Sequence, residues 1–232
     1  MKTVAPSTAW LRVLTMIVVL WLLPGALGFG FFAQYIADRF QSDLVLGAFV
    51  LDLVFAVIIA IIVGGIVAWQ RAHSETLADL GWRKPTQRVA VMGGVVLGLA
   101  WVALSYARGG SPWAAPWERP VMAVIGSFLA FGEELAVRGF LMEQLRRGGV
   151  ATWPEVLVSA VVMGSYHGVV GFHYSPLYAI SAAVLFGLVS VLFVLGHRSL
   201  TPGLVAHALT HLLGDPTLTV GILLGVLSFQ NA

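Results

Sequence analysis

Long apolar stretches separated by short polar segments run along the whole chain. An α-helix needs about 20 apolar residues to cross the ~30 Å hydrocarbon core of a bilayer, so such stretches predict transmembrane helices. The pattern places helices at 13–34, 45–69, 88–107, 121–145, 154–172, 178–196, 201–213 and 216–230, the seventh being short for a full crossing. The predicted fold is all-α, a single integral membrane domain built as a bundle of about eight transmembrane helices.

The composition supports a membrane protein and narrows its chemistry. The chain is 59% hydrophobic and 10% charged, whereas soluble domains carry about 25% charged residues. The absence of cysteine excludes disulfides, a thiolate nucleophile and thiolate metal ligands. The first apolar run, 13–32, follows Lys2 and Arg12 as a signal peptide would, but its length and Pro24 predict a retained span.

Lysine and arginine positions predict the orientation of the bundle, because cytoplasmic loops of membrane proteins carry an excess of these residues. With a cytoplasmic N-terminus, three of them fall outside, Arg39, Arg108 and Arg119, and Arg138 falls within a helix. Nine fall inside: Lys2, Arg12, Arg71, Arg83, Lys84, Arg88, Arg146, Arg147 and Arg198. Both termini are therefore predicted to be cytoplasmic. The scattered charges form no basic patch, so no nucleic-acid partner is expected.

The longest predicted cytoplasmic loop, 70–87, is amphipathic. Its Leu77, Leu80 and Trp82 are expected to lie on the membrane surface.

Three charged residues interrupt the fourth predicted helix, in the stretch GEELAVRGFL. Glu134 and Arg138 lie four residues apart, about 40° apart around a helix, and can form an ion pair. Glu133 lies about 100° from Glu134 and is left without a partner on its own helix. An unpaired carboxylate in a poorly hydrated site is suited to act as a general base. The alternative is that all three form a buried salt-bridge network.

Three histidines are also expected at membrane depth. His167 lies in the fifth predicted helix, and His207 and His211 lie one turn apart on one face of the seventh. Asp52, in the second helix, is assigned to a helix-packing contact, with Arg138 as the candidate partner. Ionisable groups within membrane spans are costly, and those that persist commonly face a functional site.

These residues allow three kinds of chemistry. In peptide hydrolysis, Glu133 would activate water, His167 would orient it, and His207 and His211 would donate hydrogen bonds to the oxyanion. A zinc site would use Glu133, His167, His207 and His211 as ligands, although the H-E-x-x-H helix is absent. A proton relay in a transporter is the non-enzymatic alternative, although the sequence shows no inverted repeat.

The three segments together resemble the CAAX protease and bacteriocin-processing family, also called the CPBP or ABI family. GEELAVRGFL resembles its E-E-x-x-x-R motif, MGSYH (163–167) its F-x-x-x-H motif, and HALTH (207–211) its H-x-x-x-N/D motif, within residues 118–214. These proteins are glutamate-dependent intramembrane endopeptidases, and type II CAAX prenyl endopeptidases belong to them. The resemblance implies Glu133 as the base for water, Glu134 and Arg138 as its support, and His167 as the residue that assists the water. It assigns the oxyanion hole to His207 and His211.

Two positions depart from the family pattern. Met163 stands where an aromatic residue is usual, which affects packing. His211 stands where Asn or Asp is expected. A neutral imidazole can also donate one hydrogen bond, but it is a better zinc ligand than an amide. The family also includes proteins assigned to bacteriocin self-immunity.

The sequence thus predicts an intramembrane endopeptidase without cofactor, with zinc as the alternative. Its predicted parts are N-terminal helices with the amphipathic loop (1–117), a catalytic core (118–214) and a C-terminal helix (215–232). Its expected partners are membrane lipid and a peptide or protein substrate at the membrane. The Ala-, Val- and Gly-rich composition favours a prokaryotic plasma membrane.

Overall fold

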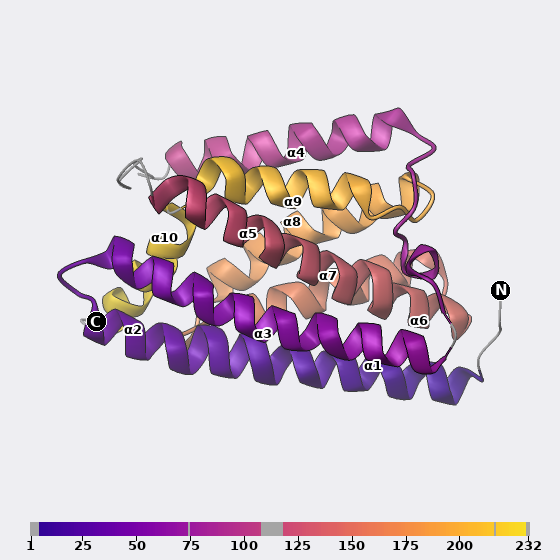
Figure 1. Ribbon diagram of the computed structural model, residues 1–232, viewed down its shortest axis with the longest axis horizontal. Coiled ribbons are helices and arrows are strands. Elements are labelled where there is room, and N and C mark those ends of the chain that lie inside the picture. Colours follow the sequence, from indigo (N-terminus) through magenta and orange to yellow (C-terminus); the bar gives the residue numbers. More distant parts are fainter. Residues whose placement is uncertain (1–4, 74, 108–117, 216, 231–232) are drawn as a thin grey trace.

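The computed structural model describes residues 5–73, 75–107, 118–215 and 217–230, and it is an elongated bundle of helices (Figure 1). The chain begins with one long helix of three parts, α1 (Pro6–Leu20), the π-helical stretch η1 (Trp21–Phe32) and α2 (Ala33–Arg39). Pro24 lies inside η1. Proline has no backbone N–H, and the wider π-helical turns accommodate the missing hydrogen bond.

The next elements pack beside this first helix. Helix α3 (Leu44–Ala72) begins where the side chain of Asp43 accepts a hydrogen bond of 3.0 Å from the Leu46 amide. A short 3-10 turn, η2 (Leu77–Leu80), separates it from α4 (Arg88–Ala107). Helix α5 (Glu118–Glu134), a second π-helical stretch η3 (Leu135–Leu141) and α6 (Met142–Arg147) then form another long helix.

The last part of the chain contains the shorter helices. Helix α7 (Thr152–His167) leads through a hairpin of β1 (Val169–Val170) and β2 (His173–Tyr174) to α8 (Pro176–Leu195). Helices α9 (Thr201–Gly214) and α10 (Thr217–Gln230) follow. The predicted fifth helix, 154–172, was too long, because α7 ends at His167 and the chain turns at Gly171, whose φ is +61°.

Helix α9 lies at the centre of the C-terminal half, in contact with α4, α5 and α8 (Figure 1). Glycines allow its close approach to α4. A β-carbon at Gly98 would lie 2.6 Å from the carbonyl oxygen of Ala206, and one at Gly94 would clash with the carbonyl of Pro202. Small residues of this kind let helix backbones pack closely in membranes. Here the close packing against α4 fixes the position of α9, and therefore of its histidines, along the bundle axis.

Among the residues that the structure describes, four helical stretches are long and apolar enough to cross a membrane: Pro6–Arg39, Leu44–Ala72, Arg119–Arg147 and Pro176–Leu195. A fifth results if α9 and α10, which are bent by 74° relative to each other, are counted as one. These helices make the chain a multi-pass membrane protein. Each of the eight predicted segments contains a helix.

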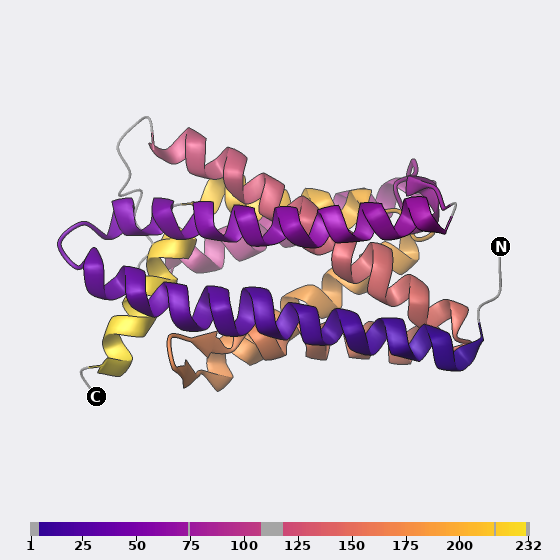
Figure 2. The same cartoon turned by 60° about the horizontal axis from the view of Figure 1, so that its bottom comes forward.

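The last helix differs from the predicted eighth span. Helix α10 does not return along the bundle but stays at the end where α9 finishes (Figure 1). The start of α1 and the end of α10 therefore lie at opposite ends of the bundle in both views (Figures 1 and 2). This arrangement does not fit the prediction that both termini share the cytoplasmic side.

The predicted amphipathic loop is folded against the bundle. Thr76 and Asp79 form a capping box around η2, and the N–H and hydroxyl donors of Thr76 lower the pKa of the Asp79 carboxyl. Leu77 and Trp82 are exposed, as expected for a loop at the membrane surface, but Leu80 is fully buried. Leu80 packs against Gly139 of η3, where a β-carbon would lie 2.7 Å from the Leu80 carbonyl oxygen. The prediction for Leu80 was therefore wrong.

Candidate active site

Glu134 and Arg138 form the predicted ion pair in the interior of the bundle. Arg138 Nη1 lies 3.1 Å from Glu134 Oε1, and both side chains are fully buried. The same guanidinium donates to the carbonyl of Phe186 at 2.7 Å and to Ser190 Oγ at 3.2 Å, and it lies over the Phe186 ring. These contacts satisfy the buried cation. They also join the start of η3 to α8.

Asp52 is not the partner of Arg138. Its Oδ1 accepts a hydrogen bond of 2.8 Å from Thr219 Oγ1 of α10. The sequence could not predict this contact, because it depends on how α10 packs across the end of α3.

Glu133 faces a different group of side chains, as its angular position predicts. Its Oε1 accepts a hydrogen bond of 3.1 Å from the Tyr166 hydroxyl, and the same atom lies 4.0 Å from His167 Nε2. Its Oε2 lies 3.6 Å from His207 Nε2. Glu133 therefore contacts residues of α7 and α9, and no cation on its own helix pairs with it among the described residues.

His207 lies between the two glutamates. Its Nδ1 is 3.3 Å from Glu134 Oε1, and its Nε2 is directed at Glu133. Because a carboxylate only accepts hydrogen bonds, the ring donates to Glu134 through Nδ1. His207 therefore links the Glu134–Arg138 pair to the free carboxylate of Glu133.

His167 has one defined tautomer when it is neutral. Its Nδ1 lies 2.8 Å from the carbonyl oxygen of Met163. A carbonyl can only accept, so Nδ1 carries the proton and Nε2 presents a lone pair toward Glu133. The departure at Met163 leaves this contact intact, because the contact uses the backbone. The Met163 side chain places its Sδ 3.2 Å from the Tyr166 hydroxyl.

His211 lies beside this group but has a partner of its own. Its Nδ1 is 2.8 Å from Asp215 Oδ2, one turn further along α9. The His207 and His211 rings are 5.2 Å apart.

A cavity of about 200 Å³ connects these residues. Most of its wall is apolar, and its acidic and histidine lining residues are Asp52, Glu133, His167, His207 and His211. The described residues that line it include no lysine or arginine. Such a cavity can accept a segment of peptide with its reacting bond next to the polar residues.

The residues of the alternative zinc site do not assemble into one. Within the described ranges, no group of three or more His, Cys, Asp or Glu side chains is arranged to hold a metal ion. The Nδ1 atoms of His167 and His211 are directed at Met163 and Asp215.

Sequence reasoning missed three polar residues around the site: Tyr166, Ser190 and Asp215. Tyr166 is adjacent to His167, and Asp215 follows His211 by four residues, a spacing that places two side chains on one helix face. Only that second signal could have been recognised in advance. Ser190 could not have been recognised, because it lies in the apolar helix α8 with no other polar residue close to it in sequence.

Gly203, in the Thr-Pro-Gly start of α9, lets Glu134 approach. A β-carbon there would clash with Glu134 Oε2 and lie 2.9 Å from Val189 Cγ1. We expect Gly203→Ala to lower the free energy of unfolding by about 1–3 kcal/mol, the usual cost of overpacking. Denaturant unfolding in detergent would measure this. Gly65→Ala is the matched control, since nothing lies within 4 Å of its β-carbon position, and an unchanged Gly203 variant would contradict the packing argument.

Comparison with known proteins agrees with this site. Residues 115–213 match the family model described as type II CAAX prenyl endopeptidase Rce1-like. No curated protein and no solved structure matches the chain. Because the matched family consists of endopeptidases, the match implies that this membrane protein is a peptide-bond hydrolase. Residues 115–213 carry an Rce1-like type II CAAX prenyl endopeptidase domain, which confirms the resemblance read from the three motifs.

Proposed function

We propose that the chain is an intramembrane endopeptidase in which Glu133 activates a water molecule for attack on a peptide bond. One observation carries this proposal: Glu133 Oε1 and His167 Nε2 are 4.0 Å apart on the wall of the same cavity. Both atoms are hydrogen-bond acceptors. A water about 2.8 Å from each would donate one hydrogen to each, with its lone pair free to attack a carbonyl carbon.

The other residues have supporting roles in this proposal. Tyr166 donates to Glu133 Oε1 and fixes the carboxylate. Glu134 and Arg138 hold His207, which in turn faces Glu133 Oε2. During the reaction, Glu133 takes a proton from water as the oxygen attacks, and it returns that proton to the leaving amine. His207 and His211 are the proposed donors to the developing oxyanion. Because Nδ1 of His207 already donates to Glu134, His207 can donate to the oxyanion through Nε2 only as an imidazolium.

All three predicted parts of the chain contribute to the cavity. Phe55 comes from 1–117, His207 from 118–214, and Thr219 from 215–232. The division at these boundaries stays a prediction, and 118–214 is proposed as the catalytic core.

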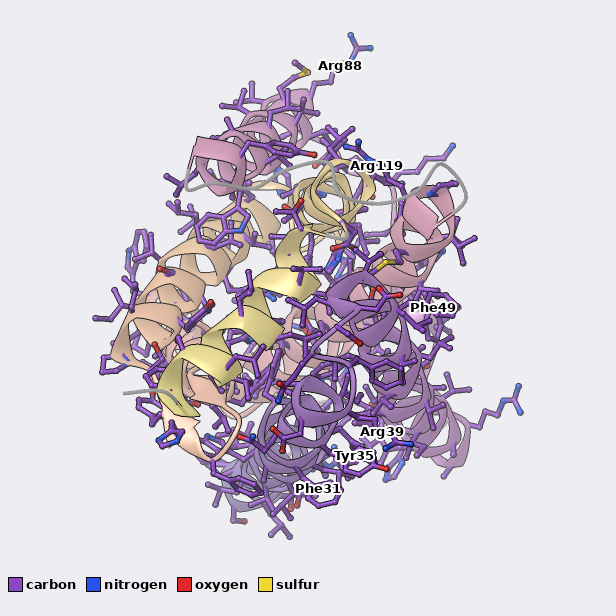
Figure 3. All side chains as sticks on the ribbon, turned by 90° about the vertical axis from the view of Figure 1, so that its left-hand side faces the viewer. Phe31, Tyr35, Arg39, Phe49, Arg88 and Arg119 are labelled. Carbon is purple, nitrogen blue, oxygen red and sulfur yellow. The ribbon has the colours of Figure 1, made fainter. Side chains whose placement is uncertain are left out.

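The proposed orientation places the start of α1 in the cytoplasm of a prokaryotic cell. Eight described cations lie toward that end, Arg12, Arg71, Arg83, Lys84, Arg88, Arg146, Arg147 and Arg198, while Lys2 and Arg108 lie outside the described residues. The opposite end carries Arg39 and Arg119, with the exposed aromatic pair Phe31 and Tyr35 beside it (Figure 3). Exposed aromatic residues of this kind are typical of a membrane interface.

Single cysteines can test this orientation, because the chain has none of its own. In intact cells, a membrane-impermeant maleimide should label Ser42→Cys, near Arg39. It should label Thr86→Cys, in the basic loop, only after the membrane is opened. Both positions are exposed in the structure. The reverse labelling pattern would contradict the orientation without affecting the proposed chemistry.

A proteome-wide comparison of N- and C-termini tests the function. Cells that express the wild type should contain cleaved termini that are missing from cells with Glu133→Ala, and those termini would identify the substrate. The outcome against a protease is equal sets of termini together with a proton flux in liposomes that depends on Glu133, as a transporter would show.

A further inference from the structure

Asp215 is held in a defined position next to His211. It is the residue that ends α9, and its backbone N–H donates to the His211 carbonyl at 3.0 Å. Its side chain turns back so that Oδ2 lies 2.8 Å from His211 Nδ1, and only 1% of the residue is exposed. The other oxygen, Oδ1, has no hydrogen-bond partner among the described residues. A buried carboxylate with this geometry needs a positive charge close by.

Neighbouring helices leave room for this pair and add charge to it. On α5, a β-carbon at Gly126 would lie 2.5 Å from both Asp215 Oδ2 and His211 Nδ1. Gly126 precedes Glu133 by seven residues, so one face of α5 presents both positions to α9. On α3, the buried side chain of Asp52 lies close enough to interact electrostatically with Asp215 and His211.

The contact with Asp215 decides what the rest of the His211 ring can do. A carboxylate accepts, so Nδ1 must be the donor. In a neutral ring, Nε2 would then be an acceptor and could not stabilise an oxyanion. In an imidazolium, Nε2 also carries a hydrogen and can donate. His211 lines the cavity. Because Nδ1 faces Asp215, Nε2 is the ring nitrogen that remains to contact a group bound in the cavity.

The charges around His211 favour the imidazolium. Four titratable groups face His211. His207 lies on the same helix, α9, and Asp215 ends that helix, while Asp52 comes from α3 and Glu133 from α5. Three of these four are carboxylates, and the described lining of the cavity adds no lysine or arginine to balance them. In a poorly hydrated interior, the carboxylate of Asp215, 2.8 Å from the ring, stabilises the charged form of His211 strongly.

We propose that Asp215 is a positioning residue that holds His211 as an imidazolium, so that Nε2–H serves as the charged hydrogen-bond donor to the oxyanion. This proposal rests on the proposed endopeptidase function for the identity of the oxyanion. It replaces the neutral imidazole expected from the sequence, because the single donor of a neutral ring is used by Asp215. An asparagine at position 211 would need no such partner, since its amide donates without a charge.

The charge state can be measured without any substrate. The chain has six histidines, and ¹⁵N-histidine NMR of the purified protein distinguishes neutral tautomers from the imidazolium. The signal that His211→Asn removes belongs to His211. At neutral pH, it should be that of an imidazolium in the wild type and of a neutral ring in Asp215→Asn. A neutral His211 in the wild type, or an identical signal in both proteins, would overturn the proposal.

Kinetics separate positioning from a structural role. Asp215→Asn should lower kcat on the order of 10²-fold, the usual effect of losing one oxyanion donor, with a small change in KM. In a His211→Asn background, the same substitution should change kcat less than about twofold, because no imidazolium remains to be held. An equal loss in both backgrounds would mean that Asp215 only supports the fold.

The pH profile supplies an independent readout. The donor exists only while His211 is protonated, so the activity of the wild type should fall as the pH rises through its deprotonation. This alkaline decline should be absent in His211→Asn, and its persistence there would count against the proposal. If Glu133→Ala leaves cleavage unchanged, the proposed endopeptidase mechanism is wrong. The NMR experiment tests separately whether Asp215 holds His211 as an imidazolium, because it needs no substrate.

Discussion

Replacing Glu133 with glutamine should reduce the rate of peptide hydrolysis by about 10²- to 10⁴-fold, the contribution usual for a general base. Glutamine keeps the size of the side chain and can still accept the hydrogen bond of Tyr166, which lies 3.1 Å from Oε1. It cannot take a proton from water. The loss should therefore fall on kcat and leave KM nearly unchanged. Steady-state cleavage of the substrate identified from the new termini would measure both constants.

A matched carboxylate controls for general effects of removing charge. Asp38 is exposed at the end of α2 and accepts a hydrogen bond from Gln34, outside the lining of the cavity. Asp38→Asn should retain the activity of the wild type. If Glu133→Gln were as active as this control, Glu133 could not be the base, and the water position between Glu133 and His167 would have no role.

The two glutamates are adjacent in sequence but serve different purposes because of helical geometry. Glu134 is turned toward Arg138 and α8, while Glu133 is turned toward α7 and α9. His207 contacts both, so any change in the ion pair should also be transmitted to the general base. The π-helical stretch that begins at Leu135 follows directly after them, and such stretches frequently occur at functional sites.

The local part of the site could be predicted from the sequence. The Glu134–Arg138 pair depends only on the spacing of residues along one helix, and the structure confirms it. The positions of most apolar helices follow equally well from their composition. The catalytic roles assigned to Glu133 and the histidines stay predictions.

Contacts between distant segments could not be predicted in the same way. The partner of Asp52 comes from α10, which lies 167 residues away along the chain. The direction of α10 depends on its packing against α2 and α3, which no hydropathy pattern records. Tyr166 was overlooked for a different reason, because a tyrosine in an apolar helix has no signature that separates it from a packing residue.

Removing the charge of Arg138 should destabilise the protein strongly. Arg138→Met keeps the length of the side chain but leaves Glu134 as a fully buried carboxylate without its cation. Only His207 would then remain as a polar contact of Oε1, and Oε2 has no hydrogen-bond partner among the described residues. Breaking a buried ion pair in this way costs about 3–5 kcal/mol. Denaturant unfolding in detergent micelles would show the loss as a lower free energy of unfolding.

A second substitution distinguishes an unpaired charge from lost packing. Adding Glu134→Gln to Arg138→Met removes the uncompensated carboxylate, so the double variant should recover most of the stability, since replacing both members of a buried pair is often close to neutral. The Phe186 carbonyl and Ser190 would lose the same donor in both variants, so their contribution cancels in the comparison. A double variant as unstable as Arg138→Met would show that Arg138 stabilises the bundle through α8. Recovery of stability without recovery of activity would show that the pair is also needed to hold His207 against Glu133.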